Sequence, residues 1–235
     1  MKWRVIDRDP TDAVHAPRPA RFPAPVIAAE QARAVMAAFV AHSLEPAVAL
    51  ALGAGLRAGE VAGLRWSAVD LDTGILRVDG TLQRVRIEGK WCLEFGEPKT
   101  DRSRRVLDLP AWTVDVLRAH RKHQAERRLF LGEAWTDLDL VLERGDGSAL
   151  DPCGLSDRFR RRLRDAGLPL VRFHDVRHAH ATLLLADGYP LKAISERLGH
   201  STIGITGDLY AHVTPALASE AVRRLDTIFG PAAGE

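Results

Sequence analysis

The sequence predicts a mainly α-helical fold with one small antiparallel β-sheet, an α+β class, and three observations lead to this prediction. Apolar residues recur at helical spacing between residues 27 and 64 and again beyond residue 110. Four segments between residues 75 and 109 have the composition and length of strands. Short turns that contain glycine separate these segments, so we expect the strands to pair antiparallel.

The chain before the strands predicts three helices. Residues 27–43 place apolar side chains such as Val35 and Phe39 on one face, which is typical of an amphipathic helix. Residues 46–54 are apolar nearly all round, so we expect a buried helix there. A glycine-rich turn and a short helix with Val61 should follow. The glycines of this turn are Gly53, Gly55 and Gly59.

The sheet and the later helices follow from the same patterns. The strands are expected at 75–78, 82–87, 91–95 and 104–109. Turns are expected at residues 72–74 and 88–90. Further helices are expected at 111–128, 155–166, 175–187, 190–198 and 215–228.

Composition limits the class of protein. Hydrophobic residues make up 46% of the 235 residues, which is enough for a substantial core. No apolar run approaches the ~18 residues of a transmembrane helix, and the N-terminus has no apolar stretch of the signal-peptide type. The two cysteines, Cys92 and Cys153, have no metal-binding spacing, and free thiols indicate a reducing cytoplasm. Residues 10–25 contain five prolines and read as a semi-extended linker.

Charge is unevenly distributed along the chain. The net charge is only +2, but residues 118–128 carry five Arg or Lys against one Glu, and residues 157–177 carry seven Arg against three Asp. Basic segments in a nearly neutral chain suit the binding of a polyanion along one face. The alternative for any single run is a solvated helix face.

Two pairs of residues and one lysine could carry chemistry, each with an ordinary structural alternative. Arg57 lies between glycines with Glu60 three residues on, which could hold a functional guanidinium or be a surface ion pair. Lys99 follows a proline and precedes a strand, so it should lie at the tip of a turn, where a solvated lysine is common. His174 and Arg177 share a face near a helix N-terminus, where free N–H groups favour a phosphate.

The same helix also has a metal-ligand spacing. His174 and His178 are four residues apart, and with His200 they could form the zinc site of a metal hydrolase. The segment lacks the Glu of an H-E-x-x-H motif, and Asp175 should point to another side of the helix. Histidines that cap and pack a helix start are the alternative.

The set and order of these residues resemble the catalytic domain of the tyrosine recombinases, the phage integrase family. The matching motifs are GLRAGE, PKT, HDVRH, LGHS and T-x-x-x-Y-x-H-V, and the resemblance covers about residues 26–225. It implies the DNA breaking–rejoining catalytic fold and assigns the catalytic residues as Arg57, Lys99, His174, Arg177, His200 and Tyr210. Glu60 and His212 are the implied supporting residues.

The chemistry of each residue type fits its implied role. Arg57 and Arg177 would clamp the phosphodiester oxygens, and His200 would add a third donor. Tyr210 would attack the phosphorus and form a phosphotyrosine, with His174 accepting its proton. Lys99 would protonate the departing 5′-hydroxyl. The cations would do the electrostatic work of a metal, so no metal and no cofactor is expected. Tyr189, the second tyrosine, reads as a packing residue.

The resemblance also implies a partner and a domain plan. The partner is double-stranded DNA, on which a homo-tetramer is expected, and we expect no association with a membrane. Residues 1–25 are interpreted as the end of a core-binding domain with the Pro-rich linker, and 26–235 as the catalytic domain. Residues expected to contact DNA are Thr100, Arg102, Arg104, Arg161 and Arg164.

The main functional hypothesis is a site-specific recombinase or integrase that cleaves and rejoins DNA through a 3′-phosphotyrosine, in a prophage or mobile element. A type IB topoisomerase-like activity uses the same chemistry. A truncated recombinase that binds DNA or a partner recombinase without completing strand exchange is the non-enzymatic alternative.

Overall fold

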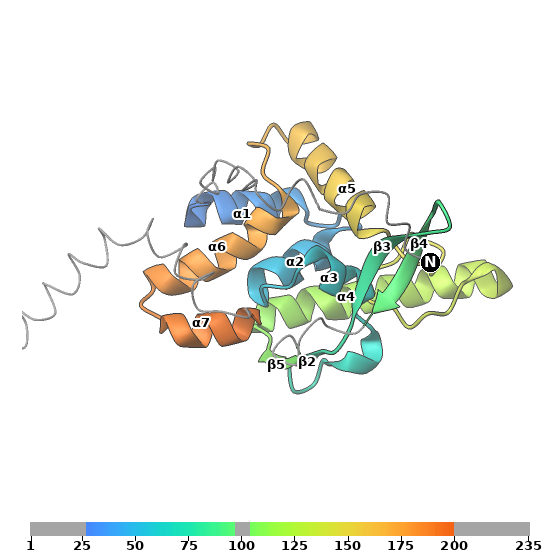
Figure 1. Cartoon of the computed structure of the whole chain (residues 1–235), viewed down its shortest axis with the longest axis horizontal. Coiled ribbons are helices and arrows are strands. Elements are labelled where there is room, and N and C mark those ends of the chain that lie inside the picture. Colours follow the sequence, from blue (N-terminus) through green and yellow to red (C-terminus); the bar gives the residue numbers. More distant parts are fainter. Residues whose placement is uncertain (1–26, 97–103, 200–235) are drawn as a thin grey trace, which may run out of the picture.

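The helical body is built around one buried helix. The computed structural model describes residues 27–96 and 104–199. At its centre lies α2 (Glu45–Gly53), which contacts α1 (Ala29–Ala38), α3 (Ala58–Gly63), α4 (Ala111–Leu131) and α6 (Phe173–Ala186) (Figure 1). Seven of its nine residues are buried, which confirms the prediction of a buried helix. Because α2 is apolar on every face, it can be covered on all sides.

The later helices close the core. They are α5 (Pro152–Asp165) and α7 (Leu191–Leu198), and short 3₁₀ turns occur at Trp66–Ala68 and Gly132–Ala134. Phe159 of α5 stacks on Phe39 with ring centroids 5.2 Å apart and meets the edge of Phe173 at 5.4 Å. These three aromatic rings join the end of α1 to α5 and α6.

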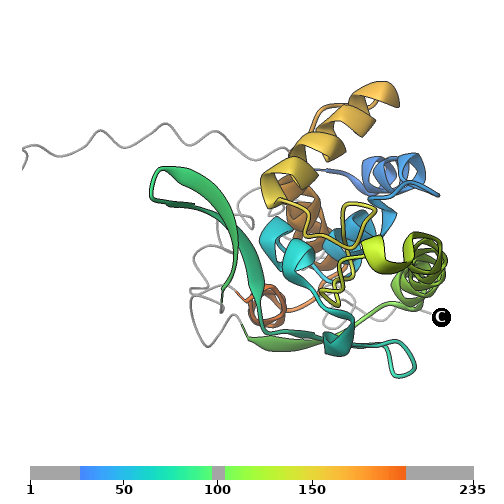
Figure 2. The same cartoon turned by 90° about the vertical axis from the view of Figure 1, so that its right-hand side faces the viewer.

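The strands form two separate sheets, not one. β1 (Val69–Asp70), β2 (Ile75–Val78) and β5 (Arg105–Asp108) make a three-stranded antiparallel sheet. Within the described part of the chain, β3 (Thr81–Ile87) pairs with β4 (Lys90–Gly96) alone. The fold class is confirmed, but the expected single sheet is wrong. The β3–β4 hairpin projects from the body in Figure 2.

Close packing of β3 against α3 explains why the hairpin leaves the sheet. A Cβ built on Gly63 would lie 2.7 Å from the backbone nitrogen of Leu82, and one on Gly59 would lie 2.9 Å from the Leu82 carbonyl oxygen. The two glycines therefore let the backbone of β3 lie directly on α3. This contact takes the place of a contact with the other sheet.

The hairpin turn is the one predicted at residues 88–90. Glu88 and Gly89 both have positive φ, 49° and 81°, which is typical of a two-residue type I′ connection. Leu82 of the hairpin is buried, but Ile87, Trp91, Leu93 and Phe95 are exposed. Guanidinium groups lie over two of the exposed rings, with Arg84 over Trp91 at 4.7 Å and Arg65 over Phe95 at 5.3 Å.

Element boundaries differ from the predictions at particular residues. The helix expected over 27–43 ends at Ala38, because Ala41 adopts a left-handed φ of 58°. The helix expected from 175 begins at Phe173, because the Asp175 carboxylate accepts a hydrogen bond from the Arg172 backbone N–H at 2.8 Å. The helix expected at 215–228 lies outside the described residues. None of the helices in the described ranges combines the length and apolar character needed to cross a bilayer.

Candidate active site

Glu60 is the buried centre of a cluster of arginines. Its Oε2 accepts a hydrogen bond of 2.8 Å from the backbone N–H of Arg57, and its Oε1 accepts one of 2.8 Å from Arg57 Nη1. The first bond caps α3, since Arg57 is the N-cap residue and Glu60 the third helical residue. Glu60 is only 7% exposed, so this pair is not the exposed surface pair of the structural alternative.

A second arginine at Glu60 was not predicted from the sequence. Arg105, the first residue of β5, donates from Nη1 to Glu60 Oε1 and from Nη2 to Glu60 Oε2, each at 3.0 Å. Its side chain is 6% exposed. A signal was present, because strand alternation puts Arg105 on the same face as the buried Leu107, and an inward-facing arginine requires a partner.

Arg177 of α6 is the third arginine beside Glu60. Its Nη1 is 3.7 Å from Glu60 Oε2 and donates to the Gly55 carbonyl oxygen, and the residue is 1% exposed. Burial and the Arg57 charge lower the pKa of Arg177 to about 9, against the opposing effect of Glu60. At neutral pH Arg177 is therefore still a cation.

The end of α7 is held by all three arginines. Arg105 Nε donates to the Arg197 carbonyl at 2.7 Å, Arg177 Nη2 to the Leu198 carbonyl at 2.6 Å, and Arg57 Nη2 to the Gly199 carbonyl at 3.2 Å. Gly199 ends the helix with a φ of 64°. Cations at a helix C-terminus are favoured by unpaired carbonyls and by the helix dipole.

A tight contact at Gly55 supports this arrangement. Gly55 has a φ of 67°, and an added Cβ would lie 2.7 Å from Leu198 and 2.9 Å from the ring of His180. The His180 ring contacts the Leu52 carbonyl through Nδ1 at 2.6 Å, and Arg197 donates to its Nε2 at 3.3 Å. Burial, outweighing the effect of the Leu52 bond, lowers the pKa of His180 to about 4. The ring is therefore neutral at pH 7, consistent with accepting a hydrogen bond from Arg197.

The charge of Glu60 is fixed by its partners. Burial alone would raise its pKa, but the hydrogen bonds and charge of Arg105, then the charge of Arg177 and the Arg57 backbone bond, lower it to about 2. Glu60 is therefore ionised at neutral pH and can hold the guanidinium groups as a carboxylate.

His174 lies at the start of α6 beside His178. Their rings meet edge to face with centroids 4.5 Å apart. Partial removal from water, then the neighbouring His178 and Arg177, lower the pKa of His174 to about 4, although the residue keeps an exposed surface. At neutral pH His174 is therefore an uncharged proton acceptor.

The metal alternative gains no support from the described residues. Among residues 27–96 and 104–199, no three His, Cys, Asp or Glu side chains are grouped as metal ligands would be. Asp175 is 1% exposed and pairs with Arg172 at 2.7 Å, so its carboxylate caps the helix. His200, the third residue of that hypothesis, lies outside the described residues.

The other expected site residues fall into two groups. Arg104, Arg161 and Arg164 are exposed, the latter two on the face of α5 opposite its buried apolar residues. Tyr189, interpreted as a packing residue, is 51% exposed and so is not part of the buried core. The expected residues that lie outside the described ranges are Lys99, Thr100, Arg102, His200, Tyr210 and His212.

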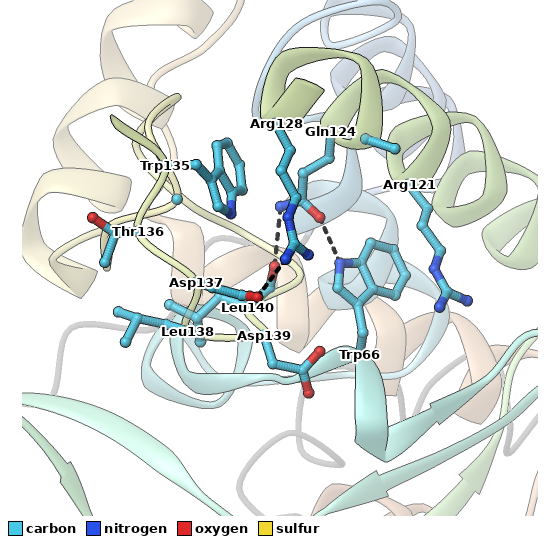
Figure 3. Close-up of a pocket in the computed structure, with 12 residues that line it drawn as sticks. Trp66, Arg121, Gln124, Arg128, Trp135, Thr136, Asp137, Leu138, Asp139 and Leu140 are labelled. Atoms are coloured by element: carbon cyan, nitrogen blue, oxygen red, sulfur yellow. Dashed lines mark hydrogen bonds and ion pairs between the residues drawn. The ribbon is translucent and has the colours of Figure 1, made fainter. Parts of the chain in front are cut away.

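A separate cavity has a structural explanation. It measures about 160 Å³ and lies between α4 and the loop over 135–147 (Figure 3). Trp66 Nε1 donates to Gln124 Oε1 at 2.6 Å, and Gln124 Nε2 donates to the Leu140 carbonyl at 3.0 Å. Arg128 pairs with Asp137 at 2.6 Å. These bonds fix the loop against α4, and none of the expected site residues lines the cavity.

Comparison with known proteins gives consistent results. The model of the phage integrase family matches residues 25–216. A tyrosine recombinase XerC-like protein of Caldanaerobacter subterraneus subsp. tengcongensis is 34% identical over 85% of this chain and 53% of its own length. An integrase of Streptomyces ambofaciens is 33% identical over 89% of this chain and 55% of its own. The chain thus spans about half the length of these relatives.

Solved structures share the fold. The Tn1549 transposon integrase in complex with transposon right-end DNA superimposes with a TM-score of 0.73 at 22% identity, over 88% of this chain and 67% of the other. The XerA recombinase superimposes with a TM-score of 0.66 at 21% identity, over 90% of this chain and 67% of the other. Since the family model covers most of the sequence and relatives above 30% identity cover the same region, the chain belongs to the phage integrase family of tyrosine recombinases.

Proposed function

We propose that this chain is the catalytic part of a site-specific DNA recombinase that cleaves and rejoins strands through a 3′-phosphotyrosine. The observation that carries the proposal is the meeting of Arg57 and Arg177 at the buried Glu60, with His174 close enough to both arginines for their charges to lower its pKa, in a chain of this family. Two fixed cations beside a neutral proton acceptor suit a phosphodiester whose charge grows during in-line attack.

Each described residue has a distinct part in the proposed reaction. Arg57, 36% exposed, donates to the non-bridging phosphate oxygens, and the buried Arg177 adds its positive charge. Glu60 orients Arg57. His174 accepts the phenolic proton as the tyrosine oxygen attacks phosphorus, and the O–P bond to the 5′-oxygen breaks.

The remaining roles rest on the family motif. Tyr210 is the proposed nucleophile, Lys99 the proton donor to the leaving 5′-hydroxyl, His200 a further phosphate donor and His212 a supporting residue. No metal or cofactor is required, because the bond energy is kept in the phosphotyrosine. We assign residues 26–235 to the catalytic domain.

The partners and setting follow from the chemistry. Exchange between two duplexes breaks four strands, so four tyrosines and hence a homo-tetramer on double-stranded DNA are proposed. Relatives named as the ICEBs1 integrase of Bacillus subtilis and the Tn1549 transposon integrase support a mobile element as the source. DNA as substrate and the exposed thiols of Cys92 and Cys153 favour the cytoplasm.

A suicide substrate tests the proposal. A duplex from the attachment sites that flank the element, nicked near the crossover so that cleavage releases a short strand, is incubated with wild type, Tyr210→Phe and Tyr189→Phe in the presence of EDTA. We expect an SDS-resistant protein–DNA adduct with wild type and with the Tyr189→Phe control, and none with Tyr210→Phe. An adduct with Tyr210→Phe, or measurable DNA binding without any wild-type adduct, would contradict the proposal.

A further inference from the structure

Arg105 is the buried arginine whose guanidinium joins three elements of the site. It makes two parallel hydrogen bonds of 3.0 Å to the Glu60 carboxylate on α3 and one of 2.7 Å to the Arg197 carbonyl at the end of α7, while its backbone belongs to β5. Such a fork fixes the plane of the carboxylate as well as its position.

From this geometry we infer that Arg105 is a positioning residue for the reaction, which acts by holding Glu60 so that Glu60 can orient Arg57. The inference deepens the proposed function and rests on it. Arg105 itself is 6% exposed and donates hydrogen bonds to Glu60 and Arg197, so the role inferred for it is to act through Glu60.

The division of bonds at Glu60 shows how the positioning works. Oε1 accepts from both Arg57 Nη1 and Arg105 Nη1, and Oε2 accepts from the Arg57 backbone and Arg105 Nη2. Among the described residues, the Arg105 fork is the pair of hydrogen bonds that reaches the carboxylate from another element, since Arg177 lies 3.7 Å away. Without Arg105, the carboxylate can turn, and the Arg57 guanidinium turns with it.

The charge of Glu60 depends on the same contact. The charged groups that face it in the described chain are Arg57 on its own helix, Arg105 from β5 and Arg177 from α6. Burial raises the pKa of Glu60, and Arg105 is the largest opposing influence. Loss of Arg105 therefore lets the pKa of Glu60 rise, and a protonated Glu60 holds Arg57 less firmly.

The test compares Arg105→Gln, Arg105→Lys, Glu60→Gln and the double variant Glu60→Gln/Arg105→Gln in the suicide-substrate assay. The matched control is Arg77→Gln on the adjacent strand β2, where Arg77 donates to the Ser67 carbonyl at 2.9 Å and has no contact with Glu60. We expect Arg105→Gln to slow cleavage by about 10–100-fold, the size expected when a reacting group is misplaced by about 1 Å. Arg105→Lys, which keeps the charge but not the fork, should recover part of the rate, and Arg77→Gln should match wild type.

Two readouts separate positioning from a purely structural role. Cleavage by Arg105→Gln should rise with pH between 5 and 8 more steeply than cleavage by wild type, and this difference should vanish in the Glu60→Gln background. The double variant should be no slower than Glu60→Gln alone, since both changes remove the same restraint. Additive losses in the double variant, or an unchanged pH profile in Arg105→Gln, would overturn the inference.

A measurement without DNA distinguishes failure of this inference from failure of the proposed function. The coupling of the Arg105→Gln and Glu60→Gln changes is measured in urea unfolding at pH 7. Absence of coupling overturns the positioning of Glu60 by Arg105, whatever the cleavage assay gives. Coupling together with normal cleavage by Arg105→Gln also overturns the inference, because the pair would then be structural only. Coupling with no wild-type adduct counts against the proposed function and leaves Arg105 as the residue that positions Glu60.

Discussion

The Glu60 carboxylate should make the stability of the protein depend on pH in the acid range. Its pKa is about 2 in the folded chain, against an ordinary value of 4.5, because the Arg105 hydrogen bonds and charge, with the other arginines, outweigh the opposing effect of burial. A pKa that is lowered on folding contributes stability above the unfolded pKa, and this contribution disappears as the pH falls toward the folded pKa. From this difference in pKa, the ionised Glu60 contributes about 3 kcal/mol to the free energy of unfolding at pH 6 and about 1 kcal/mol at pH 3.

The variant Glu60→Gln isolates this contribution. Glutamine keeps the size of the side chain but cannot ionise, so the pH-dependent part of the stability is lost while other acidic groups are unchanged. Urea unfolding of wild type and variant at pH 3, 4, 5 and 6 should give a difference in unfolding free energy that grows by about 2 kcal/mol over that range. A difference that stays constant from pH 3 to pH 6 would refute the reasoning, because Glu60 would then not be held ionised by its arginines.

Three further predictions follow from packing, charge and titration. Gly63→Ala should lower the unfolding free energy by about 2 kcal/mol, since its Cβ would meet the β3 backbone, whereas Gly154→Ala, with no atom nearer than 3.7 Å, should be neutral or slightly stabilising in the same urea assay. The double charge reversal Arg161→Glu/Arg164→Glu should weaken binding to duplex DNA and flatten its salt dependence, and unchanged binding in a titration at several salt concentrations would remove α5 from the DNA interface. The ring of His174 should titrate near pH 4 in the DNA-free protein by NMR, and a midpoint near 6.5 would show that the ring is freely hydrated.

Local patterns predicted the parts of the site that lie within one element. Arg57 and Glu60 are three residues apart, so helix geometry alone brings them together, and the structure adds the 2.8 Å bonds. The contact between Glu60 and Arg105 joins residues 45 positions apart, and it depends on where the fold places the start of β5 relative to α3. Strand alternation could have marked Arg105 as an inward-facing arginine, but spacing along the chain does not identify Glu60 as its partner.

The fold was predictable to a similar depth. The apolar pattern of residues 46–54 correctly predicted a helix buried on all faces, and the Glu88–Gly89 turn was visible in the sequence. The division of the strands into two sheets could not be predicted from the sequence, because strand propensity does not identify the partner of a strand. Gly59 and Gly63 allow the backbone of β3 to lie directly on α3. This contact cannot be recognised from either segment of the sequence alone.

The hold of three arginines on three successive carbonyls at the end of α7 makes that helix end a common reference point for the site. Arg57, Arg105 and Arg177 come from three different elements, and each donates a hydrogen bond to one of these neighbouring carbonyl oxygens. A shift of one element against the others therefore cannot move a single arginine alone without breaking its bond to this point. A displacement of the end of α7 should accordingly disturb all three arginines together, whereas a substitution at one arginine leaves the bonds of the other two in place.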